Sequence, residues 1–427
     1  MGTTGQLLGA YVWLFADRFL RLGFSFAVGV LVARHFGPSE FGQISFVVAV
    51  AGIFGAISSL GLDDIVPRDF AKNTYPGITA DDIQLTALIL RLIGGGLAYT
   101  LLLCVVWVVE GLTLIFWVAL VLGPYFLLQA TDIYEYRLRV DGRYAAIAKT
   151  RTLSSVVSNV LKVLVVALTW PITVLAIAMT VEYGVNAGIF KWIARHSPQW
   201  GRGRFRADYA RHLIGCSWKI ILAGLLVMLQ SRIEFFLIEH YLGWENVGQY
   251  AAALKVVELF DVLTVILITV LLPELTRKYA ESPVRTRRKA YLFGCISLVL
   301  LVPGMLLAIW IFPWAYGEGF DAAAMILPIF MLRPIFVMLT SVRNMLLVIE
   351  HRFWHPPIYA GIGALASVCL GFWLIPAYGL IGAVLTAILS LFVSSVMADL
   401  FVNRKNLHDL VSCWQEIPLL YRELRRG

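Results

Sequence analysis

Charged side chains interrupt several long apolar runs of the sequence, and they indicate a binding site for a charged molecule. The cations that lie deepest in these runs are Arg18, Arg21, Lys162, Arg232, Lys255 and Arg333. An ionisable residue inside a membrane span is costly and usually faces a bundle interior or a wet cavity. Because guanidinium groups bind phosphate bidentately, this excess of cations predicts a cavity for a phosphate-bearing anion.

Acidic residues inside the same runs are fewer, and they are candidates for binding a coupling ion. They are Asp17, Glu182, Glu234, Glu258 and Asp261. Lys255, Glu258 and Asp261 follow one another at intervals of three, so they form one polar stripe on a helix. Two interpretations are open, a structural ion pair between helices or a site that couples transport to H⁺ or Na⁺. For the coupling site we select Glu258 and Asp261 first, with Asp17 and Glu182 as further candidates.

Arg18 and Arg21 lie three residues apart and therefore share one face of the first apolar helix. We expect both side chains to contact the phosphate groups of the bound molecule. The alternative is a structural pair, either with Asp17, four residues before Arg21, or with Glu182.

Three further cations, Arg91, Lys219 and Arg343, lie close to the ends of their apolar runs. Within about two turns of a helix end, a long side chain can leave its alkyl stem in the apolar region while its charge reaches the interface. We therefore expect these three side chains to extend toward the lipid headgroups, outside the candidate site.

The composition is that of a membrane protein. Of the 427 residues, 59% are hydrophobic and 15% are charged, whereas a soluble globular chain has about 25% charged residues. A helical span needs about 20 mostly apolar residues. The spans predicted on this basis are 6–33, 41–62, 84–109, 113–131, 145–169, 171–193, 211–239, 246–272, 290–312, 322–349, 357–375 and 379–402. The predicted fold is thus an all-α membrane protein with twelve spans.

A short turn motif occurs twice and indicates an internal duplication. The segment from Gly37 to Gln43 matches the segment from Gly243 to Gln249 at a distance of 206 positions, and Pro67 and Pro273 keep the same distance. A repeat of this length predicts two homologous halves. Six spans per half is an even number, so both halves enter the membrane in the same orientation, as parallel repeats do.

Lys and Arg are distributed unevenly between the segments that join the predicted spans. One set of segments contains nearly all of them, and the opposite set contains only Arg34. By the positive-inside rule, both termini and the middle linker are expected to be cytoplasmic. The net charge of +8 is explained by this topology, so no nucleic-acid partner is expected.

The predicted organisation has four parts. They are an N-terminal six-helix lobe at 1–194, a basic linker at 195–210, a C-terminal six-helix lobe at 211–402 and a basic tail at 403–427. The run Gly201-Arg202-Gly203-Arg204 predicts a flexible, exposed linker. For the linker and the tail, two interpretations are open: they rest on anionic lipid headgroups, or they stay in the cytosol.

The five cysteines are scattered, without CxxC pairs or histidines at ligand spacing. We therefore expect no disulfide framework, no metal site and no cofactor. The first apolar run, 6–33, is too long for a cleavable signal peptide and contains three charged residues.

Three stretches resemble the N-terminal signature of the bacterial polysaccharide-biosynthesis flippases. They are Leu31 to Gly42 (LVARHFGPSEFG), Leu60-Gly61-Leu62 and Arg68-Asp69-Phe70-Ala71. This family belongs to the multidrug/oligosaccharidyl-lipid/polysaccharide exporter superfamily. The resemblance implies a fold like that of the multidrug exporters of the superfamily (MATE-like), with two six-helix lobes around a central cavity, and alternating access in the bacterial inner membrane.

The same resemblance implies a substrate and partners. The substrate would be an undecaprenyl-pyrophosphate-linked oligosaccharide, such as a repeat unit of lipopolysaccharide O-antigen or of exopolysaccharide, turned from the cytoplasmic to the outer leaflet. Implied partners are the lipid bilayer and the polymerase and chain-length proteins of the same pathway. The energy source would be an H⁺ or Na⁺ gradient or the membrane potential.

Two other functions are compatible with parts of the sequence. A cation-coupled multidrug exporter of the same fold would need an acidic cavity, and the excess of deep cations opposes it. A membrane-embedded enzyme that transfers glycans would need a sizeable outward loop or a cytoplasmic domain with paired carboxylates. The doublets Asp63-Asp64 and Asp81-Asp82 are interpreted as polar residues at helix boundaries, so no enzymatic activity is expected.

Overall fold

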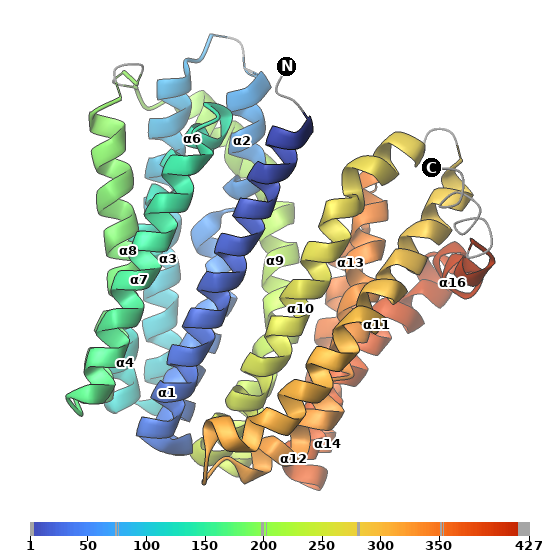
Figure 1. Cartoon of the computed structure of the whole chain (residues 1–427). Coiled ribbons are helices and arrows are strands. Elements are labelled where there is room, and N and C mark those ends of the chain that lie inside the picture. The colour runs from blue at the N-terminus through green and yellow to red at the C-terminus, as the bar shows by residue number, and fades with distance from the viewer. Residues whose placement is uncertain are drawn as a thin grey trace. The chain divides into compact units, whose positions relative to one another are not determined.

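The chain is almost entirely helical in the computed structural model (Figure 1). The structure describes residues 4–72, 75, 77–197, 200–201, 203–279, 282–350, 352 and 354–416, with the backbone alone for 4–21, 64, 72, 267–274 and 276–278. Apolar runs become helices because hydrocarbon offers no partners to backbone N–H and C=O groups. Within the described residues, eight helices are long and apolar enough to cross a membrane, or nine with one bent pair. The protein is therefore a multi-pass membrane protein.

Residue contacts divide the chain into two compact units, Met1–Leu225 and Leu226–Gly427. Unit 1 contains α1 (Thr4–Ser59), α2 (Leu62–Lys72), α3 (Ala80–Glu110), α4 (Leu114–Leu122), α5 (Tyr125–Leu128), η1 (Gln129–Thr131), α6 (Asp132–Val140), α7 (Tyr144–Ala167), α8 (Ile172–Arg195) and the first part of α9 (Ala207–Leu242). Unit 2 contains the rest of α9, α10 (Trp244–Tyr279), α11 (Pro283–Tyr316), α12 (Asp321–Phe330), α13 (Arg333–Ile349), α14 (His355–Phe392), the π-helical turn η2 (Val393–Met397), α15 (Ala398–Val402), α16 (Arg404–Val411) and η3 (Cys413–Glu416). The lobe limits expected from the sequence stay a prediction.

Two long helices are each interrupted by a glycine. Gly37 breaks α1 with φ 71°, and Gly379 breaks α14 with φ 60°. The predicted spans 6–33 and 41–62 fall on the two sides of the first break, while 357–375 ends before the second break and 379–402 begins at it. Length and hydropathy alone identify eight or nine spans among the described helices, so the number twelve stays a prediction.

Glycines at equivalent positions of the two units adopt the same backbone conformation. Gly37 and Gly243, the first residues of the repeated turn, have φ 71° and 81°. Gly111 ends α3 and Gly317 ends α11, again 206 positions apart, with φ 69° and 75°. Each of these two caps donates its N–H to the carbonyl four residues earlier at 2.9 Å. Positive φ is accessible to glycine at little cost, so both pairs support the internal duplication.

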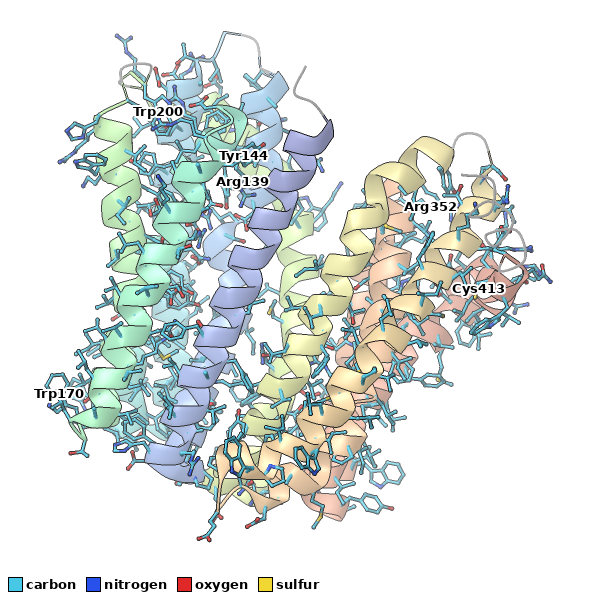
Figure 2. All side chains as sticks on the ribbon, viewed as in Figure 1. Arg139, Tyr144, Trp170, Trp200, Arg352 and Cys413 are labelled. Atoms are coloured by element: carbon cyan, nitrogen blue, oxygen red, sulfur yellow. The ribbon has the colours of Figure 1, made fainter. Side chains whose placement is uncertain are left out.

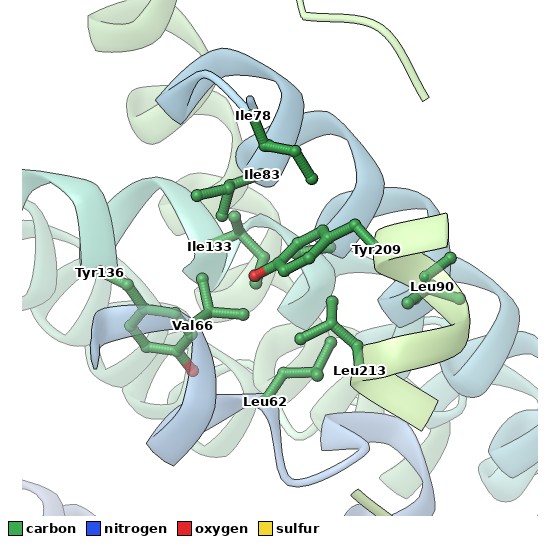
Figure 3. Close-up of a cluster of buried hydrophobic side chains, with 11 residues drawn as sticks. Leu62, Val66, Ile78, Ile83, Leu90, Ile133, Tyr136, Tyr209 and Leu213 are labelled. Atoms are coloured by element: carbon green, nitrogen blue, oxygen red, sulfur yellow. The ribbon is translucent and has the colours of Figure 1, made fainter. Parts of the chain in front are cut away.

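The core at one end of unit 1 packs α2, α3 and α6 against the first turns of α9 (Figure 3). Tyr209 of α9 is fully buried in this cluster with Val66 and Leu213. Its hydroxyl donates a hydrogen bond to Asp69 Oδ2 at 2.7 Å. Burial of a side chain such as Leu213 contributes about 1.5–3 kcal/mol. The start of α9 is therefore fixed to unit 1.

The linker between α8 and α9 is packed on α3, so the predicted flexible linker is wrong for its described residues. The Arg204 N–H donates to Asp82 Oδ1 at 2.7 Å. A Cβ at Gly203 would lie 2.0 Å from the Asp81 carbonyl oxygen. Gly203 thus permits a close approach of the two backbones. From the sequence alone, the same glycine predicts a flexible segment.

Trp200 anchors the same linker through its ring. The guanidinium of Arg137 lies 4.6 Å from the ring centroid, and the indole N–H donates to Asp141 at 3.0 Å. Arg137 also donates to Asp81 at 2.6 Å. A cation over an indole adds about 0.5–1 kcal/mol at exposed sites. The Asp81-Asp82 doublet therefore holds the linker and α6, and is more than a helix boundary.

Two of the three cations that we expected to reach the headgroups are buried instead. Arg91 is 1% exposed; its Nη1 donates to the Tyr136 hydroxyl at 2.7 Å and lies 3.1 Å from Asp63 Oδ1. Arg343 is also buried, and donates to the carbonyl oxygen of Ser394 in η2 at 2.6 Å. These partners come from other helices, so the charge need not reach water. Lys219 is exposed on α9, and its extension toward the headgroups stays a prediction.

Candidate functional site

A broken helix in unit 2 places a cation inside an apolar segment. Helices α12 and α13 are bent by 43° at Met331-Leu332. Pro328 lies in α12 and Pro334 in the first turn of α13. Proline lacks an N–H and disfavours helical backbone in the residue before it. As a result Arg333 is the first residue of α13, where unpaired backbone N–H groups add positive potential.

Arg333 forms an ion pair with Asp261 of α10. Arg333 Nη1 and Asp261 Oδ2 are 2.7 Å apart, and both side chains are 12% exposed. The contact between these two atoms is an ion pair without the geometry of a hydrogen bond, and the second carboxylate oxygen, Asp261 Oδ1, is buried without a hydrogen-bond partner. Each group thus keeps hydrogen-bonding capacity for another partner.

A second ion pair joins α9 to α10. Arg232 Nη2 donates to Glu258 Oε1 at 2.8 Å. The side chains of this pair are 26% and 35% exposed, so it is more accessible than the pair of Arg333 and Asp261. The two pairs tie α10 to its neighbours α9 and α13.

Glu234 of α9 belongs to the same cluster, although it is not among the coupling-ion candidates predicted from the sequence. It is 1% exposed. Its Oε1 accepts a hydrogen bond from the Ser367 hydroxyl of α14 at 3.0 Å, while Oε2 is buried without a partner. Its carboxyl interacts electrostatically with Arg333 and Arg232. An unsatisfied carboxyl oxygen of this kind can accept a proton or a small cation. The only signal for Glu234 in the sequence is a carboxylate inside an apolar run, and this signal does not reveal its partner Ser367.

A small pocket adjoins this carboxyl. It is lined by Gln230, Ser231, Glu234, Tyr250, Leu254, Arg333, Ala387 and Leu391. Its cavity volume of about 10 Å³ is room for about one water molecule. The pocket is therefore of the size of a water molecule or a monatomic ion, and far too small for a sugar.

The charge of the cluster differs from the cationic cavity that the sequence predicts. Among the described residues, two arginines, Arg232 and Arg333, face three carboxylates, Glu234, Glu258 and Asp261. With all five groups ionised, these side chains together carry a formal charge of −1. Arg232, Arg333, Glu258 and Asp261 are thus brought together as two ion pairs, one of the two interpretations left open for the acids.

The remaining candidates are Lys162, Glu182, Lys255, Arg18, Arg21 and Asp17. Lys162 of α7 and Glu182 of α8 are half-buried in unit 1 and attract one another electrostatically. Lys255 lies on an exposed part of α10. The side chains of Arg18, Arg21 and Asp17 are outside the described residues. Their assignment to substrate or coupling ion stays a prediction.

Residues 31–315 match the model of a protein family described as polysaccharide biosynthesis protein. No curated protein sequence matches the chain.

Solved structures share the fold. The structure of the lipid II flippase MurJ in an inward closed conformation has a TM-score of 0.72 at 15% identity, covering 96% of this chain and 93% of that one. An inward-facing multidrug resistance MATE transporter of the MOP superfamily has a TM-score of 0.71 at 14% identity, covering 93% and 96%. A MOP superfamily transporter from Pyrococcus furiosus, described as having a binding pocket of reverse polarity, has a TM-score of 0.62 at 16% identity, covering 93% of each chain.

Proposed function

We propose that this chain, which belongs to the polysaccharide biosynthesis protein family, is a flippase for a lipid-linked oligosaccharide. The proposed substrate is a repeat unit on undecaprenyl pyrophosphate, moved by alternating access from the cytoplasmic to the outer leaflet of a bacterial inner membrane, with both chain termini in the cytoplasm. The observation that carries the proposal is the family match, together with a fold likeness to the lipid II flippase over 96% of the chain.

The charge cluster of unit 2 fits the role of ion coupling in this proposal. Glu234 has a buried oxygen without a partner beside a cavity for about one water molecule. Asp261 also has an unpartnered buried oxygen, but Glu258 and Asp261 each form a direct ion pair with an arginine, at 2.8 Å and 2.7 Å, so we place Glu234 ahead of them. A proton or Na⁺ at Glu234 would weaken its attraction to Arg333. Arg333 is the first residue of α13, at the bend. Binding of a proton or Na⁺ at Glu234 would therefore change the electrostatic attraction that acts on the start of this helix.

Substrate binding is assigned in this proposal to cations that the sequence places deep in apolar runs. Arg18 and Arg21 are the first candidates for the pyrophosphate, followed by Lys162 and Lys255. Loss of one buried charge-assisted contact should cost roughly 1.5–3 kcal/mol. In affinity this corresponds to roughly 10- to 150-fold, because 1.4 kcal/mol is about tenfold.

The test is transport by purified protein in liposomes that carry a labelled polyprenyl-pyrophosphate oligosaccharide. Arg18→Gln and Arg21→Gln are expected to lower transport at normal membrane abundance, whereas Lys219→Gln, at an exposed cation of α9, should leave it unchanged. Glu234→Gln should abolish the response to an imposed H⁺ or Na⁺ gradient, with Glu239→Gln near the end of the same helix as control. Full transport by both arginine variants would refute the substrate assignment.

A cation-coupled drug exporter of the same fold is a second candidate. The observation that favours it is the excess of carboxylates over arginines among the described residues of the unit 2 cluster. The two functions separate in cells that lack the gene. The flippase predicts accumulation of the lipid-linked oligosaccharide with unchanged drug tolerance, whereas the exporter predicts drug sensitivity with a normal surface polysaccharide.

A further inference from the structure

A second cavity, of about 580 Å³, lies at the end of unit 2 where α16 is found. Figure 2 labels Arg352, one of its lining residues, at this end. The cavity is formed by the end of α10, the start of α11, the residues after α13 and the start of α16. It shares no lining residue with the Glu234 pocket. Ligand pockets typically measure roughly 300–1,000 Å³, so this cavity is large enough for a small phosphorylated molecule or a headgroup.

The cavity has more cations than anions in its lining. The cations are Arg287, Arg288, Arg352 and Lys405, and the anions are Glu350 and Asp409. Arg287 holds both anions, since it donates to Asp409 and to Glu350 and also to Asn406 outside the lining. Arg287 is thus a buried structural connection. The excess charge comes from the other three cations.

Those three cations keep capacity for a further partner. Arg288 is 20% exposed; its Nη1 donates to Gln415 Oε1 at 2.9 Å, and its Nε lies 4.0 Å from Asp409 Oδ1 without a hydrogen bond, which leaves Nη2 for a ligand. Arg352 is 47% exposed and has Glu350 at 3.3 Å. Lys405 is exposed, and within the described part of the chain no ion pair involves it. Two guanidinium forks and one ammonium group are a common combination for a phosphate.

Two helix N-termini add to the positive potential of the cavity. Pro283 and Val284, in the first turn of α11, line it, and so do Asn403 and Lys405 at the start of α16. Neither helix has a side-chain cap on its first N–H groups. Uncapped N–H groups and the helix dipole favour anions.

We propose that this cavity binds a phosphate group, carried either by an anionic lipid headgroup or by a soluble phosphate compound. The described residues of the lining have two positive charges in excess, which suits a phosphate anion. Arg288 and Lys405 bind the phosphate oxygens, and Arg287 keeps the walls together. The site is independent of the glycolipid that the proposed function transports.

The test uses the full chain in nanodiscs of neutral lipid, titrated with inorganic phosphate and followed by calorimetry and thermal unfolding. A parallel arm measures by native mass spectrometry which lipids the chain retains from nanodiscs that contain phosphatidylglycerol. Saturable binding of phosphate in neutral nanodiscs identifies a soluble ligand, and selective retention of phosphatidylglycerol alone identifies a headgroup. Both results support a phosphate site.

Variants locate the binding. Arg288→Gln and Lys405→Gln should each lower the affinity about tenfold or more, as loss of a charge-assisted contact does. Lys405→Arg keeps the charge and should keep most of the affinity. The matched control is Arg404→Gln, an exposed neighbour outside the lining. The proposal is overturned if neither ligand binds, if chloride competes as well as phosphate, or if Arg404→Gln weakens binding as much as Lys405→Gln.

Discussion

The ion pair between Arg333 and Asp261 should be far more important for stability than the neighbouring pair of Arg232 and Glu258. The first pair is 12% exposed on each side, while the second is 26% and 35% exposed. Removing one partner of a buried pair leaves an uncompensated charge, which costs about 3–5 kcal/mol. An exposed pair is worth about 0.2–1 kcal/mol. We therefore expect Arg333→Gln and Asp261→Asn each to destabilise the protein by about 3 kcal/mol or more, and Arg232→Gln and Glu258→Gln by about 1 kcal/mol or less.

A double-mutant cycle turns this difference into a measurement. In Arg333→Gln/Asp261→Asn both charges of the pair are gone, so part of the loss should be recovered, with a coupling energy within the 0.5–3 kcal/mol found for contacting residues. Recovery is incomplete because Glu234 also loses the attraction of Arg333. The assay is chemical or thermal unfolding of each variant in the same detergent. Effects that add within about 0.5 kcal/mol would show that the two groups are not paired in the folded protein.

The same double variant separates structure from transport. If Arg333 serves only as the partner of Asp261, transport should return together with stability. If Arg333 or Asp261 also binds the substrate or the coupling ion, the double variant should be stable and inactive. Transport restored to the wild-type rate would refute a direct role for either residue.

Three further outcomes follow from close contacts. Gly95→Ala should destabilise unit 1 by about 1–3 kcal/mol through overpacking, because a Cβ there would lie 2.6 Å from the Phe126 carbonyl oxygen. The control is Gly96→Ala, whose Cβ would meet nothing within 4 Å and which should leave thermal unfolding unchanged. Gly203→Ala should displace the linker and make it more sensitive to limited proteolysis. If the wild-type linker were cleaved as fast as that of the variant, the packed linker would be contradicted. Burial raises the pKa of the Cys413 thiol to about 11, so little thiolate is present at pH 7.5 and alkylation should be slower than at a cysteine with an ordinary pKa; equal rates for Cys413 and the exposed Cys216 would contradict this.

The duplication could be predicted because it depends on short-range backbone requirements. Gly37 and Gly243 both adopt positive φ at the repeated turn, a conformation that glycine permits at little cost. The pair Gly111 and Gly317 keeps the same distance of 206 positions but was overlooked. The residues around these two caps differ between the halves, so only the backbone reveals their equivalence.

The sequence does not predict whether a charged side chain points into the protein or to its surface, because the helices are apolar on nearly all sides. In an amphipathic helix the polar stripe identifies the exposed face, and here lipid and core are equally apolar. Arg91 was therefore placed by its depth alone, although Asp63 and Tyr136 of other elements hold it inside. Glu234 was passed over for the same reason, since its partner Ser367 is 133 residues away in the chain.

Linker composition is ambiguous in a different way. Glycine gives a chain freedom, and it also allows two backbones to approach where a Cβ would collide. At Gly203 the second property decides, because the α3 backbone lies against it. A Gly-Arg run thus predicts a flexible linker only where no helix start with acidic residues in its first turn, such as that of α3, is near enough to bind it.

Under the proposed function, the paired state of Arg232 and Arg333 is informative about coupling. A pyrophosphate that took either guanidinium would have to displace a carboxylate, so it would exchange one charged partner for another at small net cost. The released carboxylate would then be available to H⁺ or Na⁺. Substrate and ion would affect each other's binding by the same factor, since coupling free energies are reciprocal. A substrate affinity that is independent of H⁺ and Na⁺ concentration, measured on the same protein, would exclude this exchange and leave Arg18 and Arg21 to bind the pyrophosphate.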